Sequence, residues 1–212
     1  MPYTNLRFLW DMRQPYDLDH LDAYQGYNHT IGILAKHYNF PKTRCIAAFA
    51  ALSPSISESQ NYRALEAICL HLNGDAPAKL KLSGYGRNKA KAIAILSGKP
   101  VKDHLRGRKV TAFYNNILRP NDSDFVTVDG HLYNAWMGKR LNLTDPKLRV
   151  TDKVYDAIAA DVRILARRVS HPAPAVQAVL WFIWKRLNNI LYDPQRVLPF
   201  EFKPLPRSYF NK

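Results

Sequence analysis

Apolar residues recur along most of the chain at the three- to four-residue spacing of α-helices. In the segment from Pro41 to Leu52 almost every position is apolar, with proline at its start and Ser53-Pro54 after its end. A helix that is apolar on all sides is buried on all sides, so we expect this one to be central. Further helices are predicted over about residues 22–38, 57–72, 87–96, 109–118, 130–141, 152–169 and 174–191.

Turn-forming residues separate these predicted helices. Gly74-Asp-Ala-Pro77 interrupts the chain after the third helix, and Ser97-Gly98 and Arg119-Pro120 end two short ones. Ser57 is a candidate N-cap. From Pro194 onward the chain contains several prolines and aromatic residues, which predicts an extended arm. The pattern as a whole predicts an all-α protein.

Composition limits the class of protein and its partners. With 212 residues, of which 47% are hydrophobic, the chain can bury a core as a single domain or as two lobes. Its 31 Lys and Arg against 17 Asp and Glu give a net charge of +14, which favours a polyanionic partner such as a nucleic acid. The alternative is a generic basic surface.

Cysteine and histidine usage argues against disulfides and metal sites. Cys45 and Cys69 lie in apolar helical patterns, where a thiol is a small buried hydrophobe. The seven histidines show no paired ligand spacing, so no zinc site is expected. No apolar run approaches the ~20 residues needed to span a bilayer, and Met1–Asn5 do not begin a leader peptide. We therefore expect an intracellular protein that does not bind membranes.

The segment Val126-Thr-Val-Asp-Gly-His131 carries the most informative chemistry. A strand-like apolar pair, Val126 and Val128, places the carboxylate of Asp129 at the start of a predicted helix. The basic turn Leu105-Arg-Gly-Arg-Lys-Val110 precedes it, with Lys109 standing 20 residues before Asp129. A carboxylate at a helix start together with a glycine-containing basic turn is an active-site layout.

The order and spacing of these motifs resemble the helix-hairpin-helix DNA glycosylase superfamily, which includes endonuclease III and 8-oxoguanine glycosylase. The similarity extends from about Pro41 to Leu143 and more faintly to Arg186. It rests on four segments: Ala51-Leu-Ser-Pro54, Gly84-Tyr-Gly-Arg-Asn-Lys-Ala-Lys-Ala-Ile93, Leu105–Val110 and Val128-Asp-Gly-His131. The resemblance implies two lobes, one of about residues 41–141 and the other of residues 1–38 with 142–212. It also implies a monomer that acts on a flipped base in DNA.

The same resemblance assigns DNA-binding residues. Leu105, Arg106, Gly107 and Arg108 match the hairpin, whose backbone N–H groups bind phosphate at a helix N-terminus. Arg87 and Lys89 belong to the helix before that hairpin. The family's hairpin has two glycines separated by one residue, whereas this turn has only Gly107 and is about two residues shorter. A basic helix-capping turn that binds no nucleic acid is the alternative.

Asp129 matches the catalytic aspartate of the superfamily, which activates a nucleophile at the sugar C1′ or stabilises the oxocarbenium-like cation as the base leaves. It can equally be the N-cap of the helix that begins at Gly130, and the two roles are compatible. Lys109 matches the lysine that forms a Schiff base in glycosylase/lyases. Its alternative role is a phosphate contact. His131 has the pattern of an oriented core histidine more than that of a general base.

A flipped base also needs a pocket and a wedge that fills the gap in the stack. By resemblance, the candidates after the apolar helix are Ser53, Ser55, Gln60 and Asn61, and those beyond Asp129 are His131 and Tyr133. Trp181 and Trp184 lie three residues apart on one helical face and are expected to pack in the core. No cofactor is expected, because two cysteines cannot supply the four ligands of the iron–sulfur cluster that some family members hold.

Two other functions remain open at this point. The segment Lys109–Ile117 and the short turn also resemble the phage glutamyl/putrescinyl-thymine pyrophosphorylase group, in which Asp129 would orient or deprotonate an amine that attacks a modified base in DNA. That resemblance would make the protein phage-encoded. The third hypothesis is a DNA-binding module that keeps the fold without the chemistry.

Overall fold

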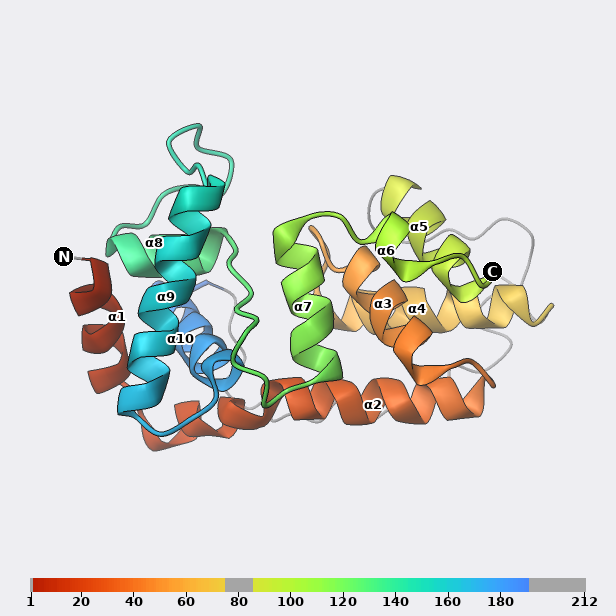
Figure 1. Cartoon of the computed structure of the whole chain (residues 1–212), viewed down its shortest axis with the longest axis horizontal. Coiled ribbons are helices and arrows are strands. Elements are labelled where there is room, and N and C mark those ends of the chain that lie inside the picture. Colours follow the sequence, from red (N-terminus) through yellow and green to blue (C-terminus); the bar gives the residue numbers. More distant parts are fainter. Residues whose placement is uncertain (1, 75–85, 191–212) are drawn as a thin grey trace. The chain divides into compact units, whose positions relative to one another are not determined.

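The computed structural model describes residues 2–74 and 86–190 (Figure 1). Within these ranges it contains helices and no strand, so the protein is all-α, as the periodicity predicts. The chain divides into two compact units. Unit 1 comprises Met1–Gly26 and Asn115–Pro199, and unit 2 comprises Tyr27–Tyr114 and Phe200–Lys212.

Unit 1 is built around a helix that is buried for most of its length. This helix, α10, begins after Pro172, which fixes the entry of the chain, and its residues from 173 to 180 are all buried. Val128, Leu132 and Ile183 belong to one core cluster, which joins the extended segment before α8 to the helices around it. The elements of this unit are α1 (Pro2–Asp11), the 3-10 helix η1 (Pro15–Asp22), α8 (Gly130–Met137), α9 (Asp152–Arg168) and α10 (Ala173–Leu187).

Unit 2 surrounds the all-apolar helix that the sequence places at the centre. Every residue from Cys45 to Leu52 in α3 is at most 3% exposed, so its predicted central position is confirmed. Arg44 ties α3 to the end of α5 by donating to the carbonyl of Ile95 at 2.7 Å. The helices of this unit are α2 (Ala23–His37), α3 (Lys42–Leu52), α4 (Glu58–Leu72), α5 (Gly86–Leu96), α6 (Val101–His104) and α7 (Arg108–Leu118), with the ends of α2 and α7 extending into unit 1.

Local capping explains where several helices begin and end. Ser57 caps α4 as predicted, because its hydroxyl accepts from the N–H of Gln60 while the Gln60 side chain accepts from the N–H of Ser57. Gly98 adopts a φ of 100° directly after α5, which ends that helix where the sequence predicts. Cys45 and Cys69 are both free and buried, in agreement with the prediction.

Some predicted boundaries are wrong. The helix expected over residues 130–141 ends at Met137, because Gly138 takes a left-handed φ of 64° and the N–H of Lys139 turns back to the carbonyl of Asn134. The last helix ends at Leu187 and not at 191. Val126–Val128 is extended but forms no strand in the described ranges. The arm predicted from Pro194 lies outside the described residues.

Three elements were not predicted: α1, η1 and α6. In α1, Leu6, Leu9 and Trp10 occupy one buried face, whereas the apolar Phe8 between them is 62% exposed and obscures the pattern. The 3-10 helix η1 begins at Pro15 after Gln14, and its short, acid-rich sequence gives no 3.6-residue pattern. The four residues of α6 are too few for periodicity to detect.

The two units divide the chain differently from the lobes that the sequence suggests. Residues 115–141 group with the terminal segments, because Val126, Val128 and Leu132 pack in the core cluster that α9 and α10 form. Residues 27–38 group with the segment that follows them, because Tyr27 packs against Phe49, with ring centroids 5.7 Å apart. Asp129 is therefore part of unit 1, and Lys109 is part of unit 2.

Candidate functional site

Asp129 lies at the N-cap of α8, where a buried extended segment ends. Its backbone is extended, with φ −119° and ψ −177°, and its Oδ1 accepts from the N–H of Leu132 at 2.9 Å. The residues before it, Val126 to Val128, are buried, whereas Asp129 itself is half-buried. The predicted capping role is confirmed, and the carboxylate stands at the boundary between core and surface.

The second carboxylate oxygen of Asp129 is held by a residue far along the chain. Trp181, on α10, donates its indole N–H to Asp129 Oδ2 at 2.9 Å. Trp181 is half-buried and lies outside the core cluster in which it was expected to pack, whereas Trp184, 6% exposed, does belong to that cluster. A half-buried indole N–H needs an acceptor, but nothing in the sequence around Trp181 indicates which residue supplies it.

A buried polar cluster lies next to the Asp129 segment. The Tyr24 hydroxyl donates to Gln177 Oε1 at 2.6 Å, and the Asn116 amide donates to the Thr127 hydroxyl at 2.9 Å. Burial raises the pKa of Tyr24 to about 12, and the negative charge of Asp129 adds to this rise, whereas hydrogen bonds with Thr127 and Asn116 oppose it. Tyr24 is thus a neutral hydrogen-bonding group at physiological pH, and it helps to fix the segment that ends in Asp129.

The surroundings of Trp181 bring further chemistry to Asp129. Lys185 Nζ lies 4.1 Å from the centroid of the Trp181 ring, a cation–π contact within α10. The rings of His131 and Trp181 meet edge to face with centroids 5.8 Å apart. Tyr133, by contrast, is 8% exposed and packs in the core cluster. A carboxylate, an indole, an imidazole and an ammonium group are thus gathered on α8 and α10.

The space beside Gly130 is already occupied by the protein. A Cβ atom at this position would lie 2.7 Å from Leu143 Cδ2, so the Leu143 side chain takes the room that the missing side chain leaves. Leu143 is 51% exposed, and it therefore covers this part of α8 from the solvent side.

The predicted hairpin is a three-residue turn between two helices. The chain leaves α6 at His104 and enters α7 at Arg108, and the Gly107 carbonyl accepts the first backbone bond of α7, from Thr111 at 2.9 Å. The Thr111 hydroxyl also donates to the carbonyl of Leu105, which is buried. Arg106, Gly107, Arg108 and Lys109 are exposed. Four consecutive exposed residues, three of them cationic, therefore stand at the N-terminus of a helix.

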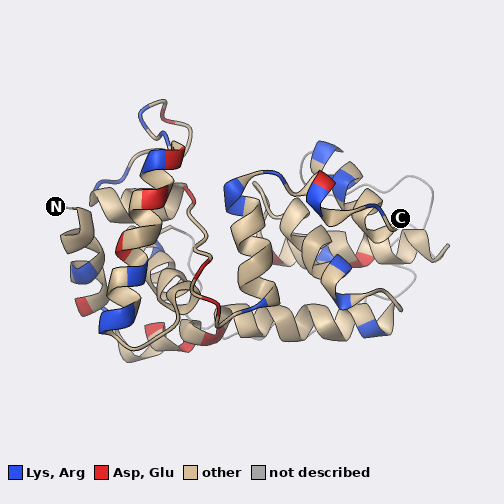
Figure 2. Ribbon diagram, in the orientation of Figure 1, with Lys and Arg blue, Asp and Glu red and all other residues tan. Residues whose placement is uncertain are grey.

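Positive charge is concentrated in the part of the sequence that forms most of unit 2. Residues 27–114 contain 14 Lys and Arg against 4 Asp and Glu, whereas residues 1–26 and 115–199 together contain 14 against 12. Figure 2 shows Lys and Arg at the starts of α5 and α7. Arg87 is exposed and Lys89 is half-buried on α5.

The candidate pocket residues after α3 have mixed surroundings. The Ser53 hydroxyl donates to the Ala50 carbonyl, and Ser55 is exposed with a φ of 66°. Gln60 is used in the capping box of α4. Asn61 is 3% exposed and donates to the Phe49 carbonyl at 3.1 Å, while its Oδ1 has no hydrogen-bond partner among the described residues. These four residues belong to unit 2, whereas Asp129, His131 and Tyr133 belong to unit 1.

No group of three or more His, Cys, Asp or Glu residues in the described ranges is arranged to hold a metal ion. Among the helices of residues 2–74 and 86–190, none is long and apolar enough to cross a membrane.

A protein-family model matches residues 16–188, most of the chain. The chain belongs to the DUF7178 family. This family is described as one of unknown function, and its matched range includes Asp129, Trp181 and the basic turn. No curated protein and no solved structure matches the chain. Membership of DUF7178 thus assigns no activity, and a functional hypothesis has to rest on the chemistry of the residues themselves.

Proposed function

We propose that this DUF7178 protein is a DNA glycosylase that cleaves the N-glycosidic bond of a modified or damaged base, with Asp129 as its catalytic carboxylate. The observation that carries the proposal is the double anchoring of this side chain. Its Oδ1 accepts from Leu132 and its Oδ2 accepts from Trp181, both at 2.9 Å, at a half-buried helix start. The resemblance to the helix-hairpin-helix glycosylases points to the same residue.

The proposed chemistry needs a fixed negative charge beside the sugar. As the bond between C1′ and the base nitrogen breaks, its electron pair leaves with the base and positive charge develops on the sugar ring. A carboxylate already oriented by two donors stabilises that charge without rearranging. Water then attacks C1′ and its proton passes to the departed base, which leaves a sugar hydroxyl in place of the base and a neutral free base.

DNA binding is the second part of the proposal. Residues 27–114 carry most of the excess positive charge, and Arg106, Arg108 and Lys109 are exposed at the start of α7. Cationic side chains and free N–H groups at a helix N-terminus bind phosphate without reading sequence. In this proposal, Arg87 and Lys89 on α5 also bind DNA phosphates.

The decisive experiment measures base release. The protein would be incubated with duplexes that carry uracil, oxidised, alkylated or hypermodified bases, and free bases would be quantified by mass spectrometry. We expect release from at least one duplex, and we expect Asp129→Asn to reduce it at least 100-fold while DNA binding is retained. Borohydride added to the same reactions would trap an adduct at Lys109 if the enzyme is also a lyase.

Asp161 offers a matched control, because it also accepts an indole N–H, that of Trp136, at 2.7 Å. Asp161→Asn changes a similar Trp–Asp pair in the same unit and should leave base release unaffected. Full activity in Asp129→Asn, or an equal loss in both variants, would exclude Asp129 as the catalytic group.

The phage base-modifying transferases are the second candidate, favoured by the resemblance of Lys109–Ile117 and by the single-glycine turn. This hypothesis predicts no free base and an absolute need for DNA that already carries a modified thymine. A non-catalytic DNA-binding module would show neither reaction, and it would lose function in Arg106→Ala with Arg108→Ala but not in Asp129→Asn.

A further inference from the structure

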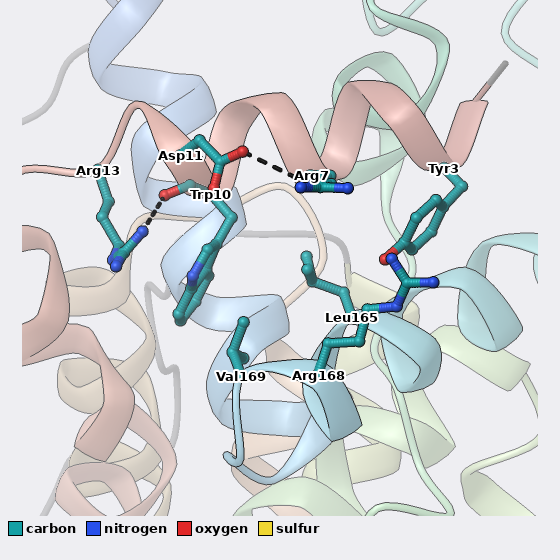
Figure 3. A pocket seen from close by; sticks show the side chains of 8 residues that line it. All are labelled: Tyr3, Arg7, Trp10, Asp11, Arg13, Leu165, Arg168 and Val169. Atoms are coloured by element: carbon teal, nitrogen blue, oxygen red, sulfur yellow. Dashed lines mark hydrogen bonds and ion pairs between the residues drawn. The ribbon is translucent and has the colours of Figure 1, made fainter.

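Unit 1 contains an open cavity of about 270 Å³ between α1 and the C-terminal end of α9 (Figure 3). Its polar lining is dominated by three arginines, two from the N-terminal segment and one from the last turn of α9. We call this group the arginine cradle, and it consists of Arg7, Arg13 and Arg168.

Aromatic rings hold two of these guanidinium groups in place. The Cζ atom of Arg168 lies 5.3 Å from the centroid of the Tyr3 ring, and that of Arg13 lies 5.0 Å from the centroid of the Trp10 ring. Arg13 also donates to the Trp10 carbonyl at 2.8 Å. A stacked guanidinium keeps donors on its edges for a planar or tetrahedral oxyanion, so these contacts orient the arginines without using all of their N–H groups.

The cradle has more positive charge than its own acid can balance. Asp11 is the acidic residue in the lining, and its Oδ2 lies 3.8 Å from Arg7 Nε with both side chains 61% exposed. Such an exposed pair is weak in water. Three cations around one cavity repel one another, and a bound anion would relieve that repulsion.

The Tyr3 hydroxyl supplies a neutral donor in the same place. Its oxygen is buried and has no hydrogen-bond partner among the described residues. Figure 3 shows this hydroxyl directed toward the Arg168 guanidinium, at the end of the cavity away from Arg13. A buried hydroxyl without a partner is unfavourable unless a ligand satisfies it.

Capping of the α9 dipole accounts for only part of this arrangement. Arg167 and Arg168 both stand in the last turn of α9, where cations are stabilised by the helix dipole. That effect does not explain Arg7 and Arg13, which come from the facing segment. Arg167, moreover, does not line the cavity.

We propose that the arginine cradle is a binding site for a phosphate group, carried either by a nucleic-acid backbone or by a free phosphorylated compound. A phosphate group has more acceptor oxygens than a carboxylate, so it can accept from Arg7, Arg168 and the Tyr3 hydroxyl, while Arg13 adds positive charge at the other end of the cavity. The proposal does not depend on base release, because Asp129 lies outside the cavity lining.

The first test titrates the full chain with inorganic phosphate at low ionic strength and follows binding by calorimetry. We expect saturable binding that weakens at least tenfold in Arg7→Gln with Arg168→Gln and remains unchanged in Arg167→Gln, the neighbouring arginine outside the cavity. Absence of saturable binding, or equal weakening in Arg167→Gln, would overturn the assignment. Asp129→Asn should bind phosphate like the unchanged protein.

Tyr3→Phe provides a second test that does not alter charge. The substitution removes a buried hydroxyl that has no partner, so the melting temperature of the phosphate-free protein should stay the same or rise. Phosphate binding should weaken severalfold. Unaltered phosphate affinity in this variant would contradict a cradle that includes the hydroxyl.

Competition identifies the source of the phosphate. Displacement of bound phosphate by a short DNA duplex would assign the cradle to a nucleic-acid backbone. Displacement by thymidine monophosphate but not by DNA would assign it to a free phosphorylated compound. If neither competes, the cradle does not bind phosphate esters and the proposal fails.

Discussion

At the scale of single residues, the Asp129 side chain satisfies two N–H groups that have different origins. One belongs to the backbone of the helix that follows it, and the other belongs to Trp181, 52 positions away. An asparagine in this position keeps an oxygen for one donor but has neither the charge nor the second oxygen. Substitution by asparagine therefore keeps the helix cap but removes the charge that the proposed chemistry needs.

Asp129→Ala should lower the free energy of unfolding by about 2 kcal/mol, because it removes the N-cap and leaves the Trp181 N–H without its acceptor. Asp129→Asn should cost less than about half of that, since asparagine caps helices as well as aspartate does. Urea denaturation of the three proteins checks this order. Equal destabilisation by both substitutions would mean that the capping bond to Leu132 contributes little and that the charge and the bond to Trp181 stabilise this segment.

Tyr24 should make stability depend on pH in the alkaline range. The unfolded chain releases this phenolic proton near pH 10, whereas burial raises the pKa of Tyr24 to about 12 in the folded protein. The folded state therefore holds more protons between these values, and the free energy of unfolding falls as pH rises from 10 to 12, by up to about 2.7 kcal/mol from this residue.

Tyr24→Phe is the matching variant. At pH 7 it should cost about 1–3 kcal/mol, because Gln177 Oε1 loses its buried donor. Between pH 10 and 12 its stability should fall less than that of the unchanged protein, although burial also raises the pKa of Tyr62 and some decline remains. Parallel pH profiles for the two proteins would show that Tyr24 is not the group responsible.

Which residues act together could be predicted only where they are close in sequence. Asp129 and Leu132 are three positions apart, so a capping aspartate was visible in the order of residue types. Tyr24 and Gln177 are separated by 153 positions, and their hydrogen bond depends on the packing of η1 and α10. No local pattern encodes such a pair, and the same is true of Arg168 and Tyr3 in the arginine cradle.

At the scale of elements, a buried ion pair joins η1 to α10. Asp17 is fully buried, and its two oxygens accept from Arg186 Nε at 3.2 Å and Nη2 at 2.8 Å. The backbone N–H of Gln14 also donates to Asp17 at 2.7 Å. A buried carboxylate with these three donors fixes how the 3-10 helix lies on α10.

Arg186→Ala should destabilise the protein by about 3 kcal/mol or more, because it leaves the Asp17 charge buried without a partner. Arg186→Lys should recover only part of this loss, since lysine cannot donate in the bidentate manner of arginine. Thermal and urea unfolding measure the stability of both variants. Arg119→Ala is a suitable control, because its ion pair with Asp122 is largely exposed on the arginine side and should contribute little.

Two glycines at helix ends should respond differently to alanine. Gly138 has a φ of 64°, and a Cβ atom there would lie 2.8 Å from Asn5 Nδ2, so Gly138→Ala should cost more than 1 kcal/mol. At Gly107 a Cβ atom would meet nothing within 4 Å, and Gly107→Ala should cost less than about 1 kcal/mol. Urea denaturation checks these values.

Gly107→Ala is consequently a clean probe of the basic turn. If DNA phosphates approach the backbone at the start of α7, the added methyl group should weaken DNA binding severalfold in a protein that remains folded. A gel-shift or anisotropy titration measures the change. Unaltered affinity would leave the neighbouring arginine side chains, and not the backbone, as the phosphate contacts.

Helices longer than ten residues were predictable from periodicity, and shorter ones were less so. In α3 and α9 the apolar positions repeat over several turns, and the observed ends lie within a residue of the predicted ones. In α6 there is only one turn. The end of α8 was missed because Leu141 continues the apolar pattern beyond Gly138, although the Leu141 carbonyl instead accepts the side-chain amide of Asn134.

At the scale of the whole molecule, charge is distributed unevenly between the two parts of the sequence. The net charge of +14 was evident from composition, but its concentration in residues 27–114 acquires meaning only once the units are known. The units themselves were not predictable, because contacts among distant helices decide that residues 115–141 group with the termini. The predicted preference for a polyanionic partner can be tested by removing cations from each unit separately.

The salt dependence of DNA binding provides that test. The logarithm of the association constant falls with the logarithm of salt concentration, with a slope of about −0.9 for each phosphate that a cation neutralises on duplex DNA. Arg106→Gln with Arg108→Gln removes two exposed cations from the start of α7. If both contact phosphates, affinity should fall and the slope should become less steep by about 1.8.

Lys147→Gln with Arg149→Gln is the matched control, since it removes two exposed cations from unit 1 and the same net charge from the protein. A general attraction between DNA and a protein of charge +14 would make both double variants lose affinity equally, because long-range attraction depends on total charge. Localised contacts at the α7 turn would change the salt slope only in Arg106→Gln with Arg108→Gln. Anisotropy titrations between 50 and 200 mM salt distinguish the two, and equal slopes in all three proteins would exclude the α7 turn as the DNA anchor.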